Sequence, residues 1–220
     1  MTNTVVFESA ARAFLQVLAG IRDRETDEPG QWERPGLGVW TVRGLAGHTS
    51  RAIITVGDYL AAGPPDGVLP GGASPSDGSS CPDAETYLLD LAGAGADHEA
   101  VAARGTAAGE ALGDDPVGSL TETLDRTLVT LATQPVDRIV SVVGGRTIPL
   151  AEYLRTRVFE LVVHTIDLSR ATGIPHAIPV RALEEAGALA ARAAARSGRG
   201  DALLLAATGR GPLPEGFSVV

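Results

Sequence analysis

The chain has 220 residues, a formal net charge of −9 at pH 7 and a sequence pI near 4.9. An acidic chain without a basic run lacks the patch that binds a phosphate backbone, so we expect no nucleic-acid partner. All 18 cationic side chains are arginine, which excludes Schiff-base lysines, pyridoxal phosphate anchoring and a P-loop lysine. Aromatic residues make up only 4% of the chain, so its core must consist mainly of Ala, Leu and Val.

The first third of the chain predicts two helices followed by a long loop. Apolar periodicity indicates a helix over residues 3–22, which an acidic stretch containing proline and glycine then ends. Thr41 is the expected N-cap of a second helix that runs to residue 62. Residues 63–82 are rich in Gly, Pro and Ser, which is typical of an irregular surface loop, and they form a candidate lid.

The only cysteine, Cys81, lies in that loop segment, so no intrachain disulfide is possible. We interpret Cys81 as a loop residue and not as a nucleophile, because a catalytic thiol needs surroundings that lower its pKa. The N-terminus shows no basic region followed by an apolar segment, and no run of 18 apolar residues occurs. We therefore expect a soluble, cytoplasmic protein without a membrane partner.

The rest of the chain predicts more helices and one hairpin. A third helix is expected over residues 83–112 and a fourth over residues 116–133, after the start signal Asp115-Pro116. Residues 138–148, with two glycines at the centre, predict a short β-hairpin. The remaining segments are expected as a helix over 149–172, an Ala-rich helix over 180–196, a short helix capped by Asp201, and an extended tail. The fold class is mainly α.

The helix expected over residues 149–172 carries an inward-facing polar stripe. At about 100° per residue, its members fall within roughly 80° of one another between two apolar borders. They are Tyr153, Arg157, Glu160, His164 and Asp167. A buried charge must be paired or bind something, because isolated buried charge is very costly. Glu160 and His164 are ligand-type residues four apart, so the stripe predicts a metal site.

A second polar face of the same helix has a simpler interpretation. Glu152, Arg155, Ser169 and Arg170 lie on the remote side, which we predict to be the solvent face of an amphipathic helix.

His48 is the natural third ligand, because it shares a stripe of the second helix with Thr41, Thr55 and Tyr59. Two histidines and one carboxylate bind a divalent metal with positions left open, as in catalytic zinc sites. Two alternatives remain. The Glu160 and His164 pair is also compatible with a plain helical hydrogen bond, and the stripe with a structural network in which Arg157 pairs with Glu160 and Asp167.

Three motifs carry a resemblance to a known family: VWTVRGLAGHTSR, then LRTRVFELVVHTIDLSRATG, and the tail TGRGPLPEGFSVV, which resembles the ends of short actinobacterial members. Together they resemble the mycothiol-dependent maleylpyruvate isomerase family of the DinB-like superfamily. The resemblance implies a DinB-like four-helix bundle over residues 1–173, with residues 174–220 as a small, mostly helical extension packing on it. It also implies a divalent metal, usually zinc, on His48, Glu160 and His164, with Asp167 orienting a ligand.

The implied activity is isomerisation or S-transfer on a small electrophilic substrate, with mycothiol as the activated nucleophile. We expect Arg157, and Arg210 if the tail folds back, to hold a substrate carboxylate, because guanidinium groups suit carboxylates. A structural ion pair is the alternative for each arginine, and for Arg210 it is the favoured one. We assign Tyr59 and Arg51 to cofactor binding. Two other functions stay open: a metal-dependent hydrolase or lyase that uses metal-bound water, and a non-catalytic metal-binding or regulatory bundle. The expected partners are a small-molecule substrate and the thiol, and a homodimer is left open.

Overall fold

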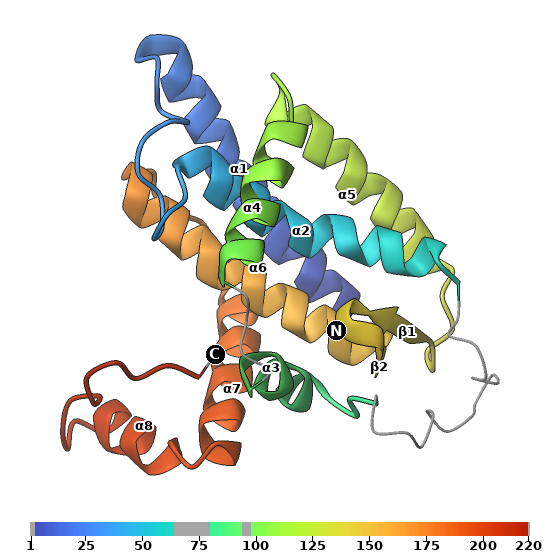
Figure 1. Cartoon of the computed structure of the whole chain (residues 1–220), viewed down its shortest axis with the longest axis vertical. Helices are drawn as coiled ribbons and strands as arrows, with labels where there is room; N and C mark the ends of the chain where they lie inside the picture. The colour runs from blue at the N-terminus through green and yellow to red at the C-terminus, as the bar shows by residue number, and fades with distance from the viewer. Residues whose placement is uncertain (1–2, 64–79, 94–97, 220) are drawn as a thin grey trace.

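The structure is a computed structural model that describes residues 3–63, 80–93 and 98–219 (Figure 1). Over these residues the chain forms eight α-helices and one two-stranded antiparallel hairpin, which confirms the prediction of a mainly helical fold. The elements in chain order are α1 (Asn3–Asp27), α2 (Val42–Ala61), α3 (Ala84–Gly93), α4 (His98–Ala111), α5 (Pro116–Ala132), β1 (Ile139–Val142), a 3₁₀ turn (Val143–Gly145), β2 (Arg146–Pro149), α6 (Leu150–Thr172), α7 (Val180–Arg196) and α8 (Gly200–Ala207).

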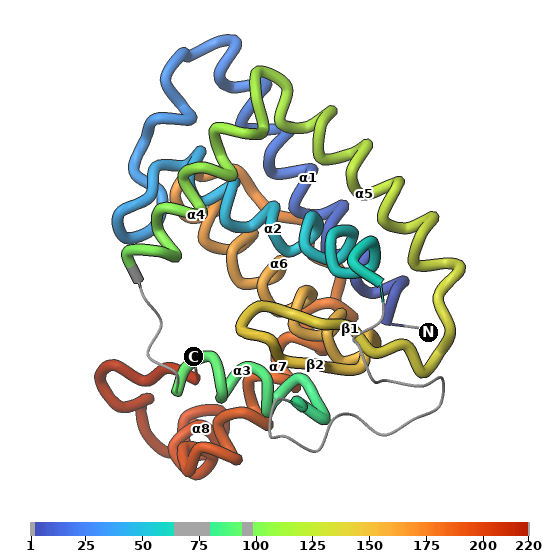
Figure 2. The backbone as a smooth tube through the Cα atoms, turned by 45° about the vertical axis from the view of Figure 1, so that its right-hand side comes forward, coloured from blue at the N-terminus to red at the C-terminus, as the bar shows by residue number. Residues whose placement is uncertain are grey.

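Four long helices form the bundle. α1 packs against α5 and α6, and α2 packs against the same two helices from the other side (Figures 1 and 2). Their contact faces follow the helical repeat: on α1 the buried positions include Phe7, Phe14, Leu18 and Ile21, each at most 1% exposed. The core is otherwise rich in Ala, Leu and Val, as the scarcity of aromatic residues predicts.

α1 is long and apolar enough to cross a membrane by length and composition alone. In the folded chain, half of the most apolar 18-residue stretch of α1 is buried, and the helix packs against α5, α6 and α7. α1 is thus a core helix of the bundle. It is also longer than predicted, because residues 23–27, three of them acidic, continue the helix and the chain turns only at Pro29 and Gly30.

The single helix predicted over residues 83–112 is wrong, because two helices with different partners occupy that range. α3 packs on α6 and α7, whereas α4 packs across α2. Gly105 and Gly109 of α4 lie at this crossing, where a Cβ on Gly47 of α2 would come within 2.0 Å of the Gly109 nitrogen. These glycines lower helix propensity, but they allow the two backbones to meet.

Most of the predicted loop over residues 63–82, and with it the candidate lid, lies outside the described residues. Cys81, at the described end, is buried, and its N–H donates to the Thr147 carbonyl at 2.8 Å. Burial and the neighbouring Asp90 carboxylate raise the pKa of the Cys81 thiol. Cys81 is therefore a core residue and not a surface loop residue, and its thiol stays protonated at neutral pH.

The hairpin and α6 follow the prediction closely. Val142 pairs with Arg146 across the turn, where Gly144 and Gly145 have φ values of 79° and 72°, a conformation that favours glycine. α6 ends at Gly173, which has a φ of 71° and donates its N–H to the Ser169 carbonyl at 2.8 Å.

The residues after Gly173 pack on one end of the bundle. α7 contacts α6, α3 and α1, and α8 contacts α7, as Figure 2 shows below the bundle. Asp201 lies in the first turn of α8 and not at its N-cap, which is Arg199. α8 begins at Gly200, two residues earlier than a cap at Asp201 predicts.

Candidate functional site

α2 and α6 bring three metal-type ligands together. Thr41 caps α2 by accepting a hydrogen bond from the Gly44 N–H, and His48 follows two turns after the cap. Glu160 and His164 lie one turn apart on the facing side of α6. Glu160 Oε2 is 3.9 Å from His48 Nε2 and 3.3 Å from His164 Nε2, and one ligand atom from each residue falls within 4.8 Å of the others.

Asp167 orients His164 from the next turn of α6. Its Oδ2 lies 3.0 Å from His164 Nδ1, which leaves Nε2 directed toward Glu160. Burial by itself would lower the pKa of His164, but hydrogen bonds with Asp167 and Glu160 raise it to about 9. A carboxylate on the far nitrogen of a ligating histidine is a common support of metal sites.

The other two ligands are held in the forms that bind cations. Burial, followed by the nearby charge of His164, lowers the pKa of His48 to about 4, so this imidazole is neutral at pH 7. Burial alone would raise the pKa of Glu160, but the hydrogen bond from His164 and the charge of Arg157 lower it to about 2. Glu160 is therefore a carboxylate.

Trp40 supports His48 in a way that periodicity did not reveal. Its indole stacks on the His48 ring at 4.5 Å between centroids, and its Nε1 donates to the Ala102 carbonyl of α4 at 2.9 Å. His48 also makes an edge-to-face contact with the His164 ring, with 4.8 Å between the ring centroids. The signal in the sequence is Gly44, midway between Trp40 and His48, where a Cβ would lie 3.0 Å from the indole.

These residues fit a divalent metal. Two imidazole nitrogens and one carboxylate oxygen form the donor set of catalytic zinc sites, which keep a further position open. The side chains are already converged, and the second nitrogen of His164 is occupied by Asp167. Such an arrangement is compatible with metal binding with little rearrangement.

A pocket of about 160 Å³ opens beside His48 and Glu160. Its wall includes three guanidinium groups, those of Arg51, Arg104 and Arg157. All three tyrosines of the chain also line it: Tyr59, Tyr87 and Tyr153. The pocket is smaller than the roughly 300 Å³ at which pockets for drug-sized ligands begin. Its size and charge suit a small anionic molecule or fragment.

Arg157 is the cation closest to the ligand cluster along α6. Its guanidinium lies 4.8 Å from the Tyr153 ring centroid, and its Nε donates to Thr156 Oγ1 at 3.1 Å. Among the described residues, no carboxylate lies within ion-pair distance of Arg157, so the alternative network with Glu160 and Asp167 is not formed. A cation without a carboxylate partner therefore faces the pocket.

The other predicted site residues divide into two groups. Tyr59 and Arg51 line the pocket, as expected for residues that contact a ligand. Arg210 does not reach it: its side chain is exposed after α8, and its Nη1 donates to the Thr208 carbonyl at 3.4 Å. The condition that the tail folds back to the site is not met for Arg210, because the tail follows α8, which packs on α7.

Several pocket residues were missed from the sequence. Tyr87 and Leu91 come from α3, Arg104 and Val101 from α4, and Val143 from the hairpin turn. None has a local motif that marks it, since each enters the pocket only when its element packs near α2 and α6.

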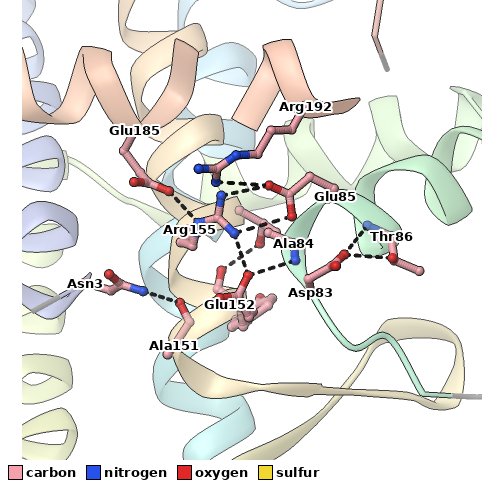
Figure 3. A network of polar contacts seen from close by, with 12 residues as sticks. Asn3, Asp83, Ala84, Glu85, Thr86, Ala151, Glu152, Arg155, Glu185 and Arg192 are labelled. Atoms are coloured by element: carbon pink, nitrogen blue, oxygen red, sulfur yellow. Dashed lines mark hydrogen bonds and ion pairs between the residues drawn. The ribbon is translucent and has the colours of Figure 1, made fainter. Parts of the chain in front are cut away.

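The predicted solvent face of α6 is also wrong at its central residue. Arg155 is buried, and its guanidinium contacts carboxylates of α3, α6 and α7 (Figure 3). Glu152 and Ser169 are partly buried, and only Arg170 of this set is exposed. α7 and α3 cover this side of α6, which the periodicity of α6 alone does not reveal.

The fold and site define a helical-bundle protein with a two-histidine, one-glutamate cluster beside a cationic pocket. A family model described as mycothiol maleylpyruvate isomerase N-terminal domain matches residues 7–169, and the chain belongs to this family. The matched range contains His48, Glu160, His164 and Asp167, and ends before α7. No curated protein and no solved structure matches the chain.

Proposed function

We propose that this protein is a metal-dependent enzyme that uses mycothiol as an activated nucleophile in isomerisation or S-transfer on a small electrophilic substrate. The observation that carries this proposal is the convergence of His48, Glu160 and His164 at the wall of a cationic pocket. Family membership supports the isomerase type of activity and the thiol cosubstrate.

His48, Glu160 and His164 would hold the metal, which we propose is zinc because of its nitrogen and oxygen donors. A bound divalent metal lowers the pKa of a coordinated thiol and so supplies a thiolate at neutral pH. Asp167 would keep His164 Nε2 directed at the ion by holding Nδ1. Trp40 would keep His48 in its ligating orientation by stacking on the ring.

Arg157 would bind a carboxylate of the substrate. Its guanidinium faces the pocket and has no carboxylate partner among the described residues, so an anionic ligand would supply the missing charge. Arg51 would lie on the other wall of the same pocket, on α2, beside His48 and Tyr59. We assign Arg51 and Tyr59 to binding of the cosubstrate.

The state of Cys81 supports an external thiol. Cys81 is the only cysteine of the chain, it is 1% exposed, and burial raises the pKa of its thiol. The protein has no reactive sulfur of its own near the pocket, so a thiol reaction would need a small-molecule thiol. We also propose that the protein acts in the cytoplasm, where such thiols remain reduced.

Cobalt substitution tests the proposal directly. The Co²⁺-loaded protein is expected to develop a thiolate-to-cobalt charge-transfer band when mycothiol is added, and the metal-free protein is expected to bind the thiol far more weakly. His48→Ala should abolish stoichiometric metal binding, whereas His176→Ala, at an exposed position, should not.

Two results would contradict the proposal. Protein purified without chelator that binds no divalent metal would favour a non-catalytic bundle. A loaded protein whose activity is the same with and without mycothiol would favour a hydrolase or lyase.

A further inference from the structure

A second polar cluster lies on the side of α6 that faces away from the pocket. Arg155 is at its centre, about 200° around the helix from Arg157. The Arg155 side chain is 10% exposed, and its guanidinium contacts three carboxylates (Figure 3). Glu85 of α3 lies at 2.9 Å, Glu152 of α6 at 2.6 Å and Glu185 of α7 at 2.5 Å.

The same cluster holds the first turn of α3. Glu152 Oε2 accepts a hydrogen bond from the Ala84 N–H at 3.1 Å, which satisfies one free donor at the start of the helix. Arg196 of α7 donates to both oxygens of Asp83, at 2.8 and 2.9 Å. The N-terminal end of α3 is therefore held by polar contacts from both α6 and α7.

Glu85 of α3 forms ion pairs with both α6 and α7. Its side chain is 3% exposed, and it contacts both Arg155 of α6 and Arg192 of α7, the latter at 3.4 Å. Removing one partner of a buried ion pair leaves an uncompensated charge and is strongly destabilising. The position of α3 is thus tied to the intact pair.

α3 supplies part of the pocket wall. Tyr87 and Leu91, on successive turns of this helix, line the pocket. The Tyr87 and Tyr153 rings pack edge to face with 6.2 Å between their centroids. α3 has only 10 residues, and helices of this length are marginal in water without tertiary contacts. Its placement therefore depends on its contacts with α6 and α7.

We infer that Arg155 and Glu85 are positioning residues of the pocket, which together with α7 hold α3 so that Tyr87 and Leu91 form a fixed wall. α7 thereby takes part in building the pocket, although none of its described residues lines it. The inference concerns the construction of the pocket and does not depend on the chemistry proposed above.

The three tyrosines give a direct test, because all of them line the pocket. Uniform labelling with 3-fluorotyrosine yields three ¹⁹F resonances, which single Tyr→Phe variants assign. In Arg155→Met the Tyr87 resonance is expected to shift or broaden, whereas that of Tyr59, on α2, should change little. Amide exchange in α3 should accelerate at least about tenfold.

Two measurements separate positioning from a general loss of stability. Zinc affinity of Arg155→Met, from chelator competition, should stay within about twofold of wild type, because the ligands lie on the other side of α6. Arg170→Met is the matched control, since Arg170 is exposed on the same helix. It should alter neither the Tyr87 resonance nor the exchange of α3.

Arg192→Met covers the case in which Arg155→Met does not fold. The Arg192 side chain is 60% exposed, so its loss is tolerable, and the Tyr87 resonance should move in the same direction by a smaller amount. An unchanged Tyr87 resonance in the folded variants, or equal changes at Tyr59 and Tyr87, would overturn the inference.

Discussion

Arg155 and Arg157 are two residues apart on α6, yet their surroundings are opposite. Arg155 is buried among three carboxylates from α3, α6 and α7, whereas Arg157 faces the pocket without a carboxylate in ion-pair range among the described residues. An arginine that pairs with carboxylates from three helices holds those helices together. A cation that lacks its counter-charge is available to a ligand, at some cost to the stability of the empty protein.

The largest change in stability should come from removing Arg155, the arginine with three carboxylate partners. Arg155→Met leaves Glu85 buried with a weaker set of partners, so we expect the free energy of unfolding to fall by about 3–5 kcal/mol. Urea unfolding followed by circular dichroism measures the change. The double variant Glu85→Gln with Arg155→Met should recover part of the loss, and no recovery would contradict the ion-pair explanation.

Arg157→Met removes the arginine that faces the pocket and forms no ion pair among the described residues. The unfolding free energy should fall far less than in Arg155→Met, because Arg157 forms no ion pair among the described residues and acts on Glu160 only through the charge that lowers its pKa. Affinity for a carboxylate substrate should fall by roughly 10- to 150-fold. Steady-state kinetics or calorimetric titration with the substrate provides the second value. A drop in stability as large as that of Arg155→Met would show that Arg157 is also structural.

A third prediction concerns Asp167, which contacts the candidate metal ligand His164. Asp167→Asn keeps the shape but weakens the hold on His164 Nδ1, so zinc affinity should fall by about 10- to 100-fold. Competition with a chromogenic chelator measures the affinity. Asp58→Asn, at an exposed position of α2, is the control and should leave it unchanged.

The smallest effect concerns protons. In the metal-free protein the pKa of His164 is raised to about 9 from an ordinary 6.5, so His164 is protonated at pH 7.5. This contribution to stability is fully present below about 6.5 and is lost as pH rises through about 9. Metal binding at pH 7.5 should therefore release about one proton from His164, and none above pH 10.

Calorimetry in buffers of different ionisation enthalpy counts that proton. Asp167→Asn should reduce the release, because loss of the carboxylate lowers the pKa of His164. Equal proton release at pH 7.5 and pH 10 would contradict the assignment to His164.

Much of the fold could be predicted from the sequence. The hairpin, α6 and α7 were predicted to within a residue or two, because their glycine turns and caps are local signals. Residues 83–112 were predicted as one helix, whereas α3 packs on α6 and α7 and α4 packs on α2, a difference in partners that has no local signal.

The sequence by itself determined the stripe of Glu160, His164 and Asp167, because residues three and four apart on one helix must share a face. Only the tertiary structure decided what meets that stripe: Trp40 against His48, and Tyr87 and Arg104 in the pocket wall. It also decided that Arg155 is buried. Helical periodicity separates the faces of one helix, but whether a face meets water, a carboxylate or a pocket depends on elements far away in the chain.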